Sequence, residues 1–226
     1  MTAQDGSDRT ARIGILAYEG VDELDLVSVL VPLTKVAASQ SPGFPIRPVL
    51  IGCGSKVRGS NGLTFEVTAD IAELARCDAA VIPGGAGVHV LHEDPELSKQ
   101  LIALVERRAP VYTICSGVFV LARLGLINGL RVAVHAQKRD ALAAIISAEQ
   151  IGSGFIHDGF LRSIGGSSAQ SYVKGLEMAY RVLNDFCPQA IDYLATRLET
   201  GPALDLANGN PPMLESDRKQ REAVLG

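Results

Sequence analysis

One short stretch, residues 111–122, constrains the fold of this chain more than any other part of the sequence. It begins with the β-prone run Val-Tyr-Thr-Ile, reaches Cys115, passes through Ser116 and Gly117, and continues as an apolar helical pattern. This order is typical of a strand that turns sharply into a helix and holds the residue at the turn out of the sheet. Amide groups at the start of such a helix would lower the pKa of a thiol below its free value of about 8.5. Cys115 is therefore a candidate nucleophile.

A buried and inert thiol is the alternative, because free cysteines are among the most buried residue types. The position at the predicted turn favours the nucleophile. The other three cysteines, Cys53, Cys77 and Cys187, are far apart and form no CxxC pair, so we expect free thiols with packing roles. Neither the cysteines nor the histidines have the spacing of metal ligands, and we predict no metal site.

Short apolar strands alternate with amphipathic helices along the rest of the chain. The predicted strands are residues 12–17, 46–52, 79–83, 111–114 and 131–134, and the predicted hairpins are 56–67 and 156–164. Helices are predicted after the turn at Cys115 and at residues 22–38, 94–108, 138–146, 169–184 and 188–199. This alternation predicts an α/β fold of the flavodoxin-like sandwich type, in which a doubly wound, mostly parallel sheet carries helices on both faces and a nucleophile elbow.

Length and composition favour one compact domain. The chain has 226 residues, of which 47% are hydrophobic and 20% are charged, enough to bury a single substantial core. We therefore predict one domain over residues 1–226, with flexible termini at 1–11 and 216–226. Prolines 202, 211 and 212 argue against a regular helix in the tail.

Charge and hydropathy limit the classes of partner. The formal net charge is −4, and the basic run at 218–221 is the one cluster of positive charge, so no nucleic-acid or membrane partner is expected. The first twelve residues lack the apolar core of a signal peptide, and no later apolar run is long enough to span a bilayer. We predict a cytoplasmic protein that acts on a small-molecule substrate.

Three groups of residues follow the carboxyl ends of predicted strands, where doubly wound sheets bind their ligands. They are the acidic cluster Asp22, Glu23 and Asp25, the loop containing Gly84 and Gly85, and Cys115. Glycines without Cβ let a backbone amide approach a reacting group, so Gly84 and Gly85 are candidate oxyanion donors, although an ordinary strand-to-helix turn would use them equally well. The pattern leaves open which carboxylate acts as the acid and which caps the helix.

Together these motifs resemble the ThiJ/PfpI superfamily of class I glutamine amidotransferase-like proteins, over nearly the whole chain. The resemblance is carried by residues 13–16 with 23–26, 82–87, 114–117 with 121–126 and Gly129, and 165–166. Within the superfamily, the chain looks most like the isonitrile (isocyanide) hydratase branch. The resemblance implies that Cys115 is the nucleophile, Asp25 its acidic partner, and the amides of Gly85 and Ser116 the oxyanion donors. It also implies a homodimer.

Two positions depart from the family pattern. Members that resemble proteases carry histidine directly after the nucleophile, whereas this chain has Ser116, which disfavours a peptidase. The hydratase branch usually carries threonine there, and His-Trp where this chain has His135 followed by Ala136. Loss of a methyl group and of a large ring predicts a wider or differently shaped pocket. We assign His135 an indirect, supporting role, with direct catalytic use as the alternative.

The predicted reaction is the addition of water to an isonitrile, giving an N-substituted formamide through a covalent cysteine thioimidate. No cofactor is required, and Asp25 would have to hold a proton near neutral pH. The first alternative is a glyoxalase or deglycase-like activity on methylglyoxal, in which the same thiol forms a hemithioacetal. The second is a non-enzymatic sensor, because a reactive thiol beside a carboxylate also oxidises readily. A ligand-sensing transcription regulator is disfavoured, since no helix-turn-helix pattern follows residue 200.

Overall fold

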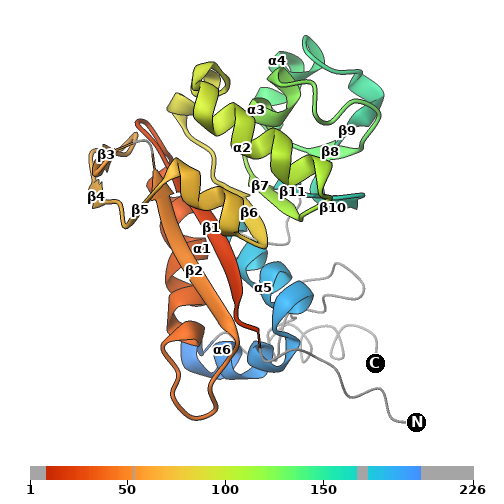
Figure 1. Cartoon of the computed structure of the whole chain (residues 1–226). Helices are drawn as coiled ribbons and strands as arrows, with labels where there is room; N and C mark the ends of the chain where they lie inside the picture. The colour runs from red at the N-terminus through yellow and green to blue at the C-terminus, as the bar shows by residue number, and fades with distance from the viewer. Residues whose placement is uncertain (1–8, 53, 167–172, 200–226) are drawn as a thin grey trace, which may run out of the picture.

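The computed structural model describes residues 9–52, 54–166 and 173–199, and all structural statements below concern these residues. A seven-stranded sheet with the order β10-β11-β7-β6-β1-β2-β5 forms the centre of the molecule (Figure 1). All neighbouring strands in it run parallel except β10, which pairs antiparallel with β11 at one edge. The α/β fold with a mostly parallel sheet is confirmed.

The strands of the central sheet are β1 (Ala11–Ala17), β2 (Ile46–Gly52), β5 (Ala69–Asp70), β6 (Ala79–Ile82), β7 (Val111–Ile114), β10 (Gly154–Asp158) and β11 (Leu161–Gly165). Two small ribbons lie outside it, the antiparallel pair β3 (Lys56–Arg58) and β4 (Thr64–Glu66) and the parallel pair β8 (Val132–Ala133) and β9 (Ile151–Gly152). All residues of β6 and β7 are buried, as expected for parallel strands covered on both faces.

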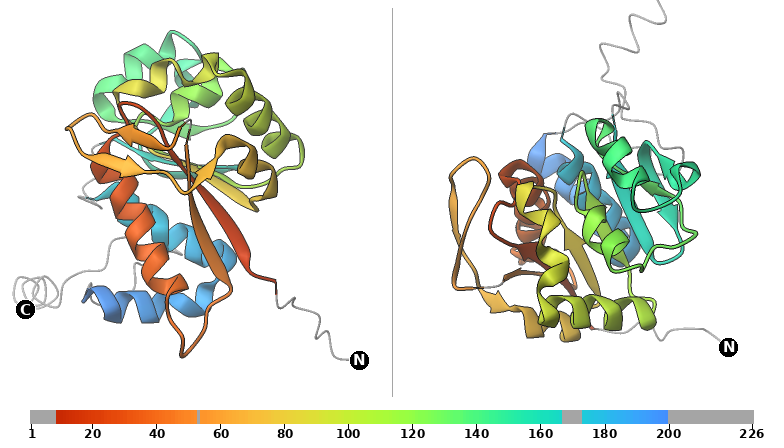
Figure 2. Two further views of the ribbon diagram at one scale, coloured as in Figure 1. Left: turned by 60° about the vertical axis from the view of Figure 1, so that its left-hand side comes forward. Right: turned by 90° about the horizontal axis from the view of Figure 1, so that it is seen from above.

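Helices cover both faces of the sheet (Figures 1 and 2). On one side lie α1 (Glu23–Ala37), α5 (Lys174–Phe186) and α6 (Ile191–Leu198); on the other lie α2 (Pro95–Glu106), α3 (Val118–Arg123) and α4 (Arg139–Ala143). Helix α1 buries Leu26, Val29, Leu33 and Val36, a spacing of three and four residues that keeps these side chains on one face. Six short 3-10 turns complete the described elements: Ile71–Arg76, Ala86–His89, Leu91–Glu93, Ala136–Lys138, Ala148–Gln150 and Pro188–Ala190.

The structure corrects the prediction for residues 131–134, which do not extend the central sheet. Strand β8 pairs with β9 instead, and β11 takes the place beside β7. Gly165 allows the backbone of Val134 to approach closely. Any residue with a Cβ at this position would overlap that backbone. The Ser163 hydroxyl also accepts the N–H of Ala133 at 2.8 Å, which ties β8 to β11 by a side chain rather than by ladder hydrogen bonds.

Helix boundaries differ at the C-terminal half. Helix α5 begins at Lys174 and not at residue 169, because Val173 has φ −125° and ψ 89°, outside the helical region; residues 169–172 lie outside the described part. Helix α4 is also shorter than predicted. Of the termini expected to be flexible, residues 1–8 and 216–226 lie outside the described part, and Ala11 already begins β1. The proline-containing tail from 202 to 212 lies outside it as well.

Candidate active site

Cys115 occupies the turn that follows β7, and its backbone is in the left-handed region with φ 56°. A non-glycine residue rarely adopts this conformation, and such strain is found mostly where a site requires it. The Cys115 N–H still donates to Ile164 O at 2.9 Å, which anchors the turn to β11. At residue 117 a Cβ would overlap Ile82 O, so the turn needs glycine to pack against the end of β6. The strand, the turn and the helix α3 thus form the predicted elbow.

The three neighbouring carboxylates on α1 have three different surroundings. Asp22 caps the helix, with its Oδ1 accepting the Asp25 N–H at 3.0 Å. Glu23 is buried and accepts from the backbone N–H and the side-chain amide of Asn61, at 2.7 and 2.6 Å. Although burial raises the pKa of Glu23, these hydrogen bonds lower it below its usual value. Asp25 alone of the three turns toward the elbow.

The side chains of Asp25, Cys115 and Ser116 converge on Gly84. A Cβ built on Gly84 would lie 2.8 Å from Asp25 Oδ2, 2.9 Å from Cys115 Cβ and 3.0 Å from Ser116 Oγ. The absence of a side chain at Gly84 therefore leaves the space in which these groups meet. Segments from the ends of β1, β6 and β7 contribute to this cluster, as expected at the carboxyl edge of a parallel sheet.

Hydrogen bonds fix the glycine loop against the other two segments. The Gly84 N–H donates to Asp25 Oδ2 at 3.1 Å, and the Gly85 N–H donates to Ser116 Oγ at 3.1 Å. Of the three amides that we predicted as oxyanion donors, those of Gly84 and Gly85 are thus hydrogen-bonded to side chains of the site. They position Asp25 and Ser116, and their role toward an oxyanion stays a prediction.

The electrostatics of Asp25 fit a proton carrier. Burial, and after it the nearby charge of Asp22, raise its pKa to about 7 against the opposing effects of the Gly84 hydrogen bond and Lys174. Asp25 therefore exchanges its proton near neutral pH. A carboxyl of ordinary pKa would be fully ionised there.

The lowered pKa expected for Cys115 is not found. Burial raises the pKa of its thiol to about 11, and the neighbouring Asp25 acts in the same direction. The backbone amide of Ser116 and the charge of Lys174 lower it by less. The helix start is thus present, but loss of water around the sulfur outweighs it. At neutral pH the thiol is protonated, and its activation requires a base.

Two residues of this region were missed from the sequence. Tyr18 directly follows β1, is 3% exposed, and places its hydroxyl 2.6 Å from Pro83 O and 2.8 Å from Gly84 O. Lys174 begins α5 and acts on both Asp25 and Cys115. The position of Tyr18 directly after an apolar strand could have indicated that it lies near the site. No local pattern connects Lys174 with residues on α1.

The remaining candidates lie elsewhere. His135 accepts the Gln137 N–H on Nδ1 at 3.2 Å and caps a 3-10 turn; it is not among the groups that converge on Gly84. Cys77 and Cys187 are buried free thiols whose pKa values burial raises, and Cys53 lies outside the described residues. Within the described ranges, no three or more His, Cys, Asp or Glu side chains are grouped to hold a metal ion. In those same ranges, no helix has the length and apolar character needed to cross a bilayer.

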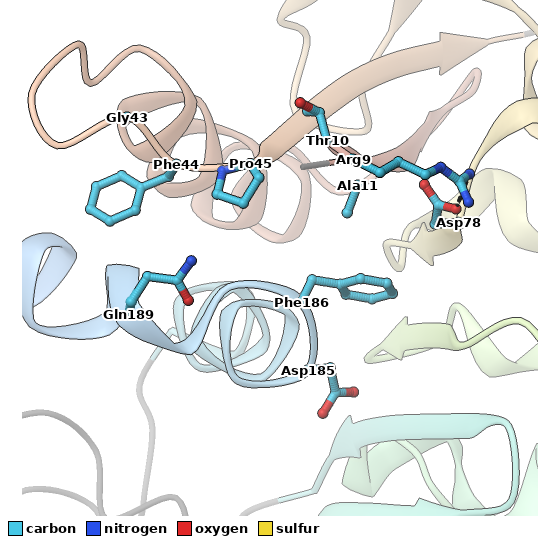
Figure 3. Close-up of a pocket in the computed structure, with 10 residues that line it drawn as sticks. All are labelled: Arg9, Thr10, Ala11, Gly43, Phe44, Pro45, Asp78, Asp185, Phe186 and Gln189. Atoms are coloured by element: carbon cyan, nitrogen blue, oxygen red, sulfur yellow. Dashed lines mark hydrogen bonds and ion pairs between the residues drawn. The ribbon is translucent and has the colours of Figure 1, made fainter. Parts of the chain in front are cut away.

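A cavity of about 780 Å³ opens at the opposite end of the sheet (Figure 3). Its lining includes Ala11, Pro45 and Asp78, which stand at or just before the amino ends of β1, β2 and β6. Phe44 and Phe186 supply apolar surface, as Figure 3 shows. None of the candidate site residues lines this cavity, so it is separate from the cluster around Gly84.

Comparison with known proteins agrees with the geometry. Residues 11–178 match the sequence pattern of the DJ-1/PfpI family. An isonitrile hydratase of Pseudomonas putida is 26% identical over 201 residues, which cover 88% of this chain and 83% of the relative. An uncharacterized protein of the cpoL 5' region in Streptomyces lividans is 30% identical over 58% of this chain and 92% of its own length. The fold matches DJ-1beta of Drosophila melanogaster with a TM-score of 0.71 at 17% identity, over 84% of this chain and 98% of that one.

Proposed function

The chain belongs to the DJ-1/PfpI family, and from this membership we propose that it is an isonitrile hydratase-like enzyme that converts an isonitrile and water into an N-substituted formamide. The observation that carries the proposal is the convergence of Asp25, Cys115 and Ser116 on Gly84. A nucleophile with an acid-base partner is what covalent hydration needs. The similarity to the Pseudomonas putida hydratase over 88% of the chain supports this reaction.

In the first step, Cys115 attacks the terminal carbon of the isonitrile. The thiol of Cys115 has a raised pKa, so Asp25 in its carboxylate form removes the proton as the carbon–sulfur bond forms. Asp25 then returns that proton to the same carbon, which gives a neutral thioimidate, R–N=CH–S–Cys115. The pKa of about 7 lets Asp25 serve as base and then as acid within one turnover.

In the second step, water adds to the thioimidate carbon and the carbon–sulfur bond breaks. The nitrogen gains one proton from water, the carbon retains the oxygen as a carbonyl, and the sulfur leaves with the remaining proton. The products are R–NH–CHO and the thiol of Cys115, so the overall reaction consumes one water molecule. Neither step calls for a metal ion or an organic cofactor.

Ser116 is proposed to orient the substrate. Its Oγ accepts the Gly85 N–H at 3.1 Å, and its hydroxyl donates to Gly85 O over the long distance of 3.4 Å, so a substrate atom near Gly84 would compete for that proton. Ser116 is 5% exposed, so such a hydrogen bond would form away from bulk water. We further propose that Gly84, Gly85 and the Ser116 amide assist where negative charge develops, and that His135 supports the region indirectly.

The test is product identification with purified protein. An aryl isonitrile and methylglyoxal are supplied separately, with Cys115→Ala as the matched control. Formation of the aryl formamide by the parent protein alone supports the proposal. Formation of lactate from methylglyoxal, without formamide, would assign the glyoxalase-like alternative. If neither lactate nor formamide forms, the result favours the oxidation sensor.

The oligomeric state, location and partners of the protein are also proposed. As the family resemblance implies, we expect a homodimer, and we place it in the cytoplasm acting on a small molecule. The formal net charge of −4 argues against a nucleic-acid or membrane partner. Light scattering after size-exclusion chromatography gives the oligomeric state directly. A mass near 24 kDa, that of one chain, would contradict the dimer.

A further inference from the structure

Tyr18, Pro83, Gly84 and Asp25 form one continuous chain of hydrogen bonds. The Tyr18 hydroxyl lies 2.6 Å from Pro83 O, and the Gly84 N–H of the same peptide unit donates to Asp25 Oδ2 at 3.1 Å. In a trans peptide the C=O and N–H point in opposite directions, so Tyr18 and Asp25 lie on opposite sides of the Pro83–Gly84 peptide. The peptide therefore connects a buried phenol to a carboxyl group of the site.

We propose that Tyr18 is a positioning residue, which orients and polarises the Pro83–Gly84 peptide so that the Gly84 N–H favours the carboxylate form of Asp25. A donor at the carbonyl withdraws electron density from the peptide and makes its N–H a stronger donor, as in other hydrogen-bonded chains. The inference deepens the proposed function, because it assigns to Tyr18 the setting of the acid-base group that the reaction uses.

Burial fixes the direction of the hydrogen bond that Tyr18 makes. Tyr18 is 3% exposed, and burial together with the neighbouring Asp25 raises the pKa of its phenol well above the usual value. The phenol therefore acts as a hydrogen-bond donor throughout the working pH range and does not ionise. Its proton has two acceptors within reach, Pro83 O and Gly84 O. Gly84 O already accepts the Asp22 N–H at 2.8 Å. Pro83 O, which is closer to the phenol, is therefore the main acceptor of the Tyr18 proton.

The other charges around Asp25 do not duplicate this effect. Asp22 on the same helix raises the pKa of Asp25, Lys174 on α5 lowers it, and Cys115 faces it from the elbow. None of these three is hydrogen-bonded to the Pro83–Gly84 peptide in the described structure. Removal of the Tyr18 hydroxyl should therefore change the Gly84 hydrogen bond while these charges stay in place.

The test is the pKa of Asp25 in Tyr18→Phe, measured by the ¹³C resonance of its carboxyl group. Cooperative strengthening adds roughly a fifth to a hydrogen bond to a charged group, so its loss should raise the pKa of Asp25 by about 0.3. The Gly84 amide proton should move upfield at high pH. The matched control is Tyr112→Phe, which deletes an equally buried hydroxyl that donates to Asp185 at 2.6 Å.

A second perturbation has the opposite sign. Site-specific fluorotyrosine at position 18 keeps the ring and the hydroxyl but makes the phenol a stronger donor, so the pKa of Asp25 should fall. The same pKa of Asp25 in the parent, Tyr18→Phe and fluorotyrosine proteins would overturn the proposal, and so would equal shifts in Tyr112→Phe. Neither measurement uses an isonitrile. If formamide production is absent while these shifts occur, the proposed function fails and the role of Tyr18 stands.

Discussion

Ser116 Oγ accepts the backbone N–H of Gly85 at 3.1 Å, and this one hydrogen bond joins the elbow after β7 to the glycine loop after β6. The hydroxyl also lies 3.4 Å from Gly85 O. Because Ser116 is the residue next to Cys115, the bond fixes the nucleophile relative to the loop that carries Gly84. The serine thereby couples two strand ends that the sequence separates by about thirty residues.

The Ser116 hydroxyl is therefore expected to affect both stability and activity. Ser116→Ala leaves the Gly85 N–H without its partner, which should cost about 1–3 kcal/mol of the free energy of unfolding. Ser116→Thr keeps the hydroxyl and should retain stability and turnover more closely. Urea denaturation and formamide production measure the two effects. Equal behaviour of both variants would contradict a role for the hydroxyl.

Cys115→Ala should abolish formamide production and leave the fold intact, because the thiol forms the covalent bond and its side chain is not part of the tightest core packing. Cys77→Ala and Cys187→Ala should retain the catalytic step, with some loss of stability from the buried position of each thiol. Trapping of the thioimidate by mass spectrometry in the parent protein completes the measurement. Normal turnover in Cys115→Ala would remove the covalent mechanism.

The order of elements was predictable because it depends on local pattern. The apolar run of β6 and the sequence Asp-Pro-Glu at the start of α2 are signals that act within a few residues. The pairing of β8 was not predictable, since it depends on the close approach of Val134 to Gly165, about thirty residues away. A short strand carries no mark of the sheet it will join.

The site shows the same division. The elbow and the acidic cluster were visible in the sequence, because each is a run of neighbouring residues. Their electrostatics were not, since the raised pKa values of Cys115 and Asp25 come first from burial by distant segments. The choice among Asp22, Glu23 and Asp25 also needed the tertiary structure. Their hydrogen-bond partners lie on α1 itself, on the loop after β3 and on the loop after β6.

Asp25→Asn should lower formamide production by about a factor of a hundred, the usual effect of removing a general acid or base. Asp22→Asn is the matched control, because asparagine caps a helix about as well as aspartate and should keep turnover within about twofold. Steady-state rates of the two variants and the parent decide the assignment. Loss in Asp22→Asn with full activity in Asp25→Asn would show that the other carboxylate is the acid.

Asp25 also predicts a pH-dependent stability. Its pKa is about 7 in the folded protein against a usual value of 3.8, so the folded state holds a proton that the unfolded chain has released. This contribution is complete below about pH 4 and is lost as the pH rises through about 7. Asp25→Asn should then be more stable than the parent at pH 8, by on the order of 4 kcal/mol, and similar to it at pH 4. Thermal unfolding at both pH values would reveal the difference, and a stability gain at pH 4 alone would reverse the sign and contradict the assignment.

Gly84→Ala and Gly85→Ala should distinguish an effect on turnover from an effect on stability. At Gly84 the new methyl group would lie 2.8–3.0 Å from Asp25 Oδ2, Cys115 Cβ and Ser116 Oγ, so it displaces these side chains and should reduce turnover at least tenfold, with a smaller loss of stability than at Gly85. At Gly85 the backbone has φ 140°, and the methyl group would overlap Gly20 O and crowd Asp22 N, both of which belong to the main chain. That strain should cost about 2 kcal/mol or more of the free energy of unfolding. Denaturation and turnover are measured on both variants. The role of Gly84 in the site is supported only if Gly84→Ala still folds and loses turnover.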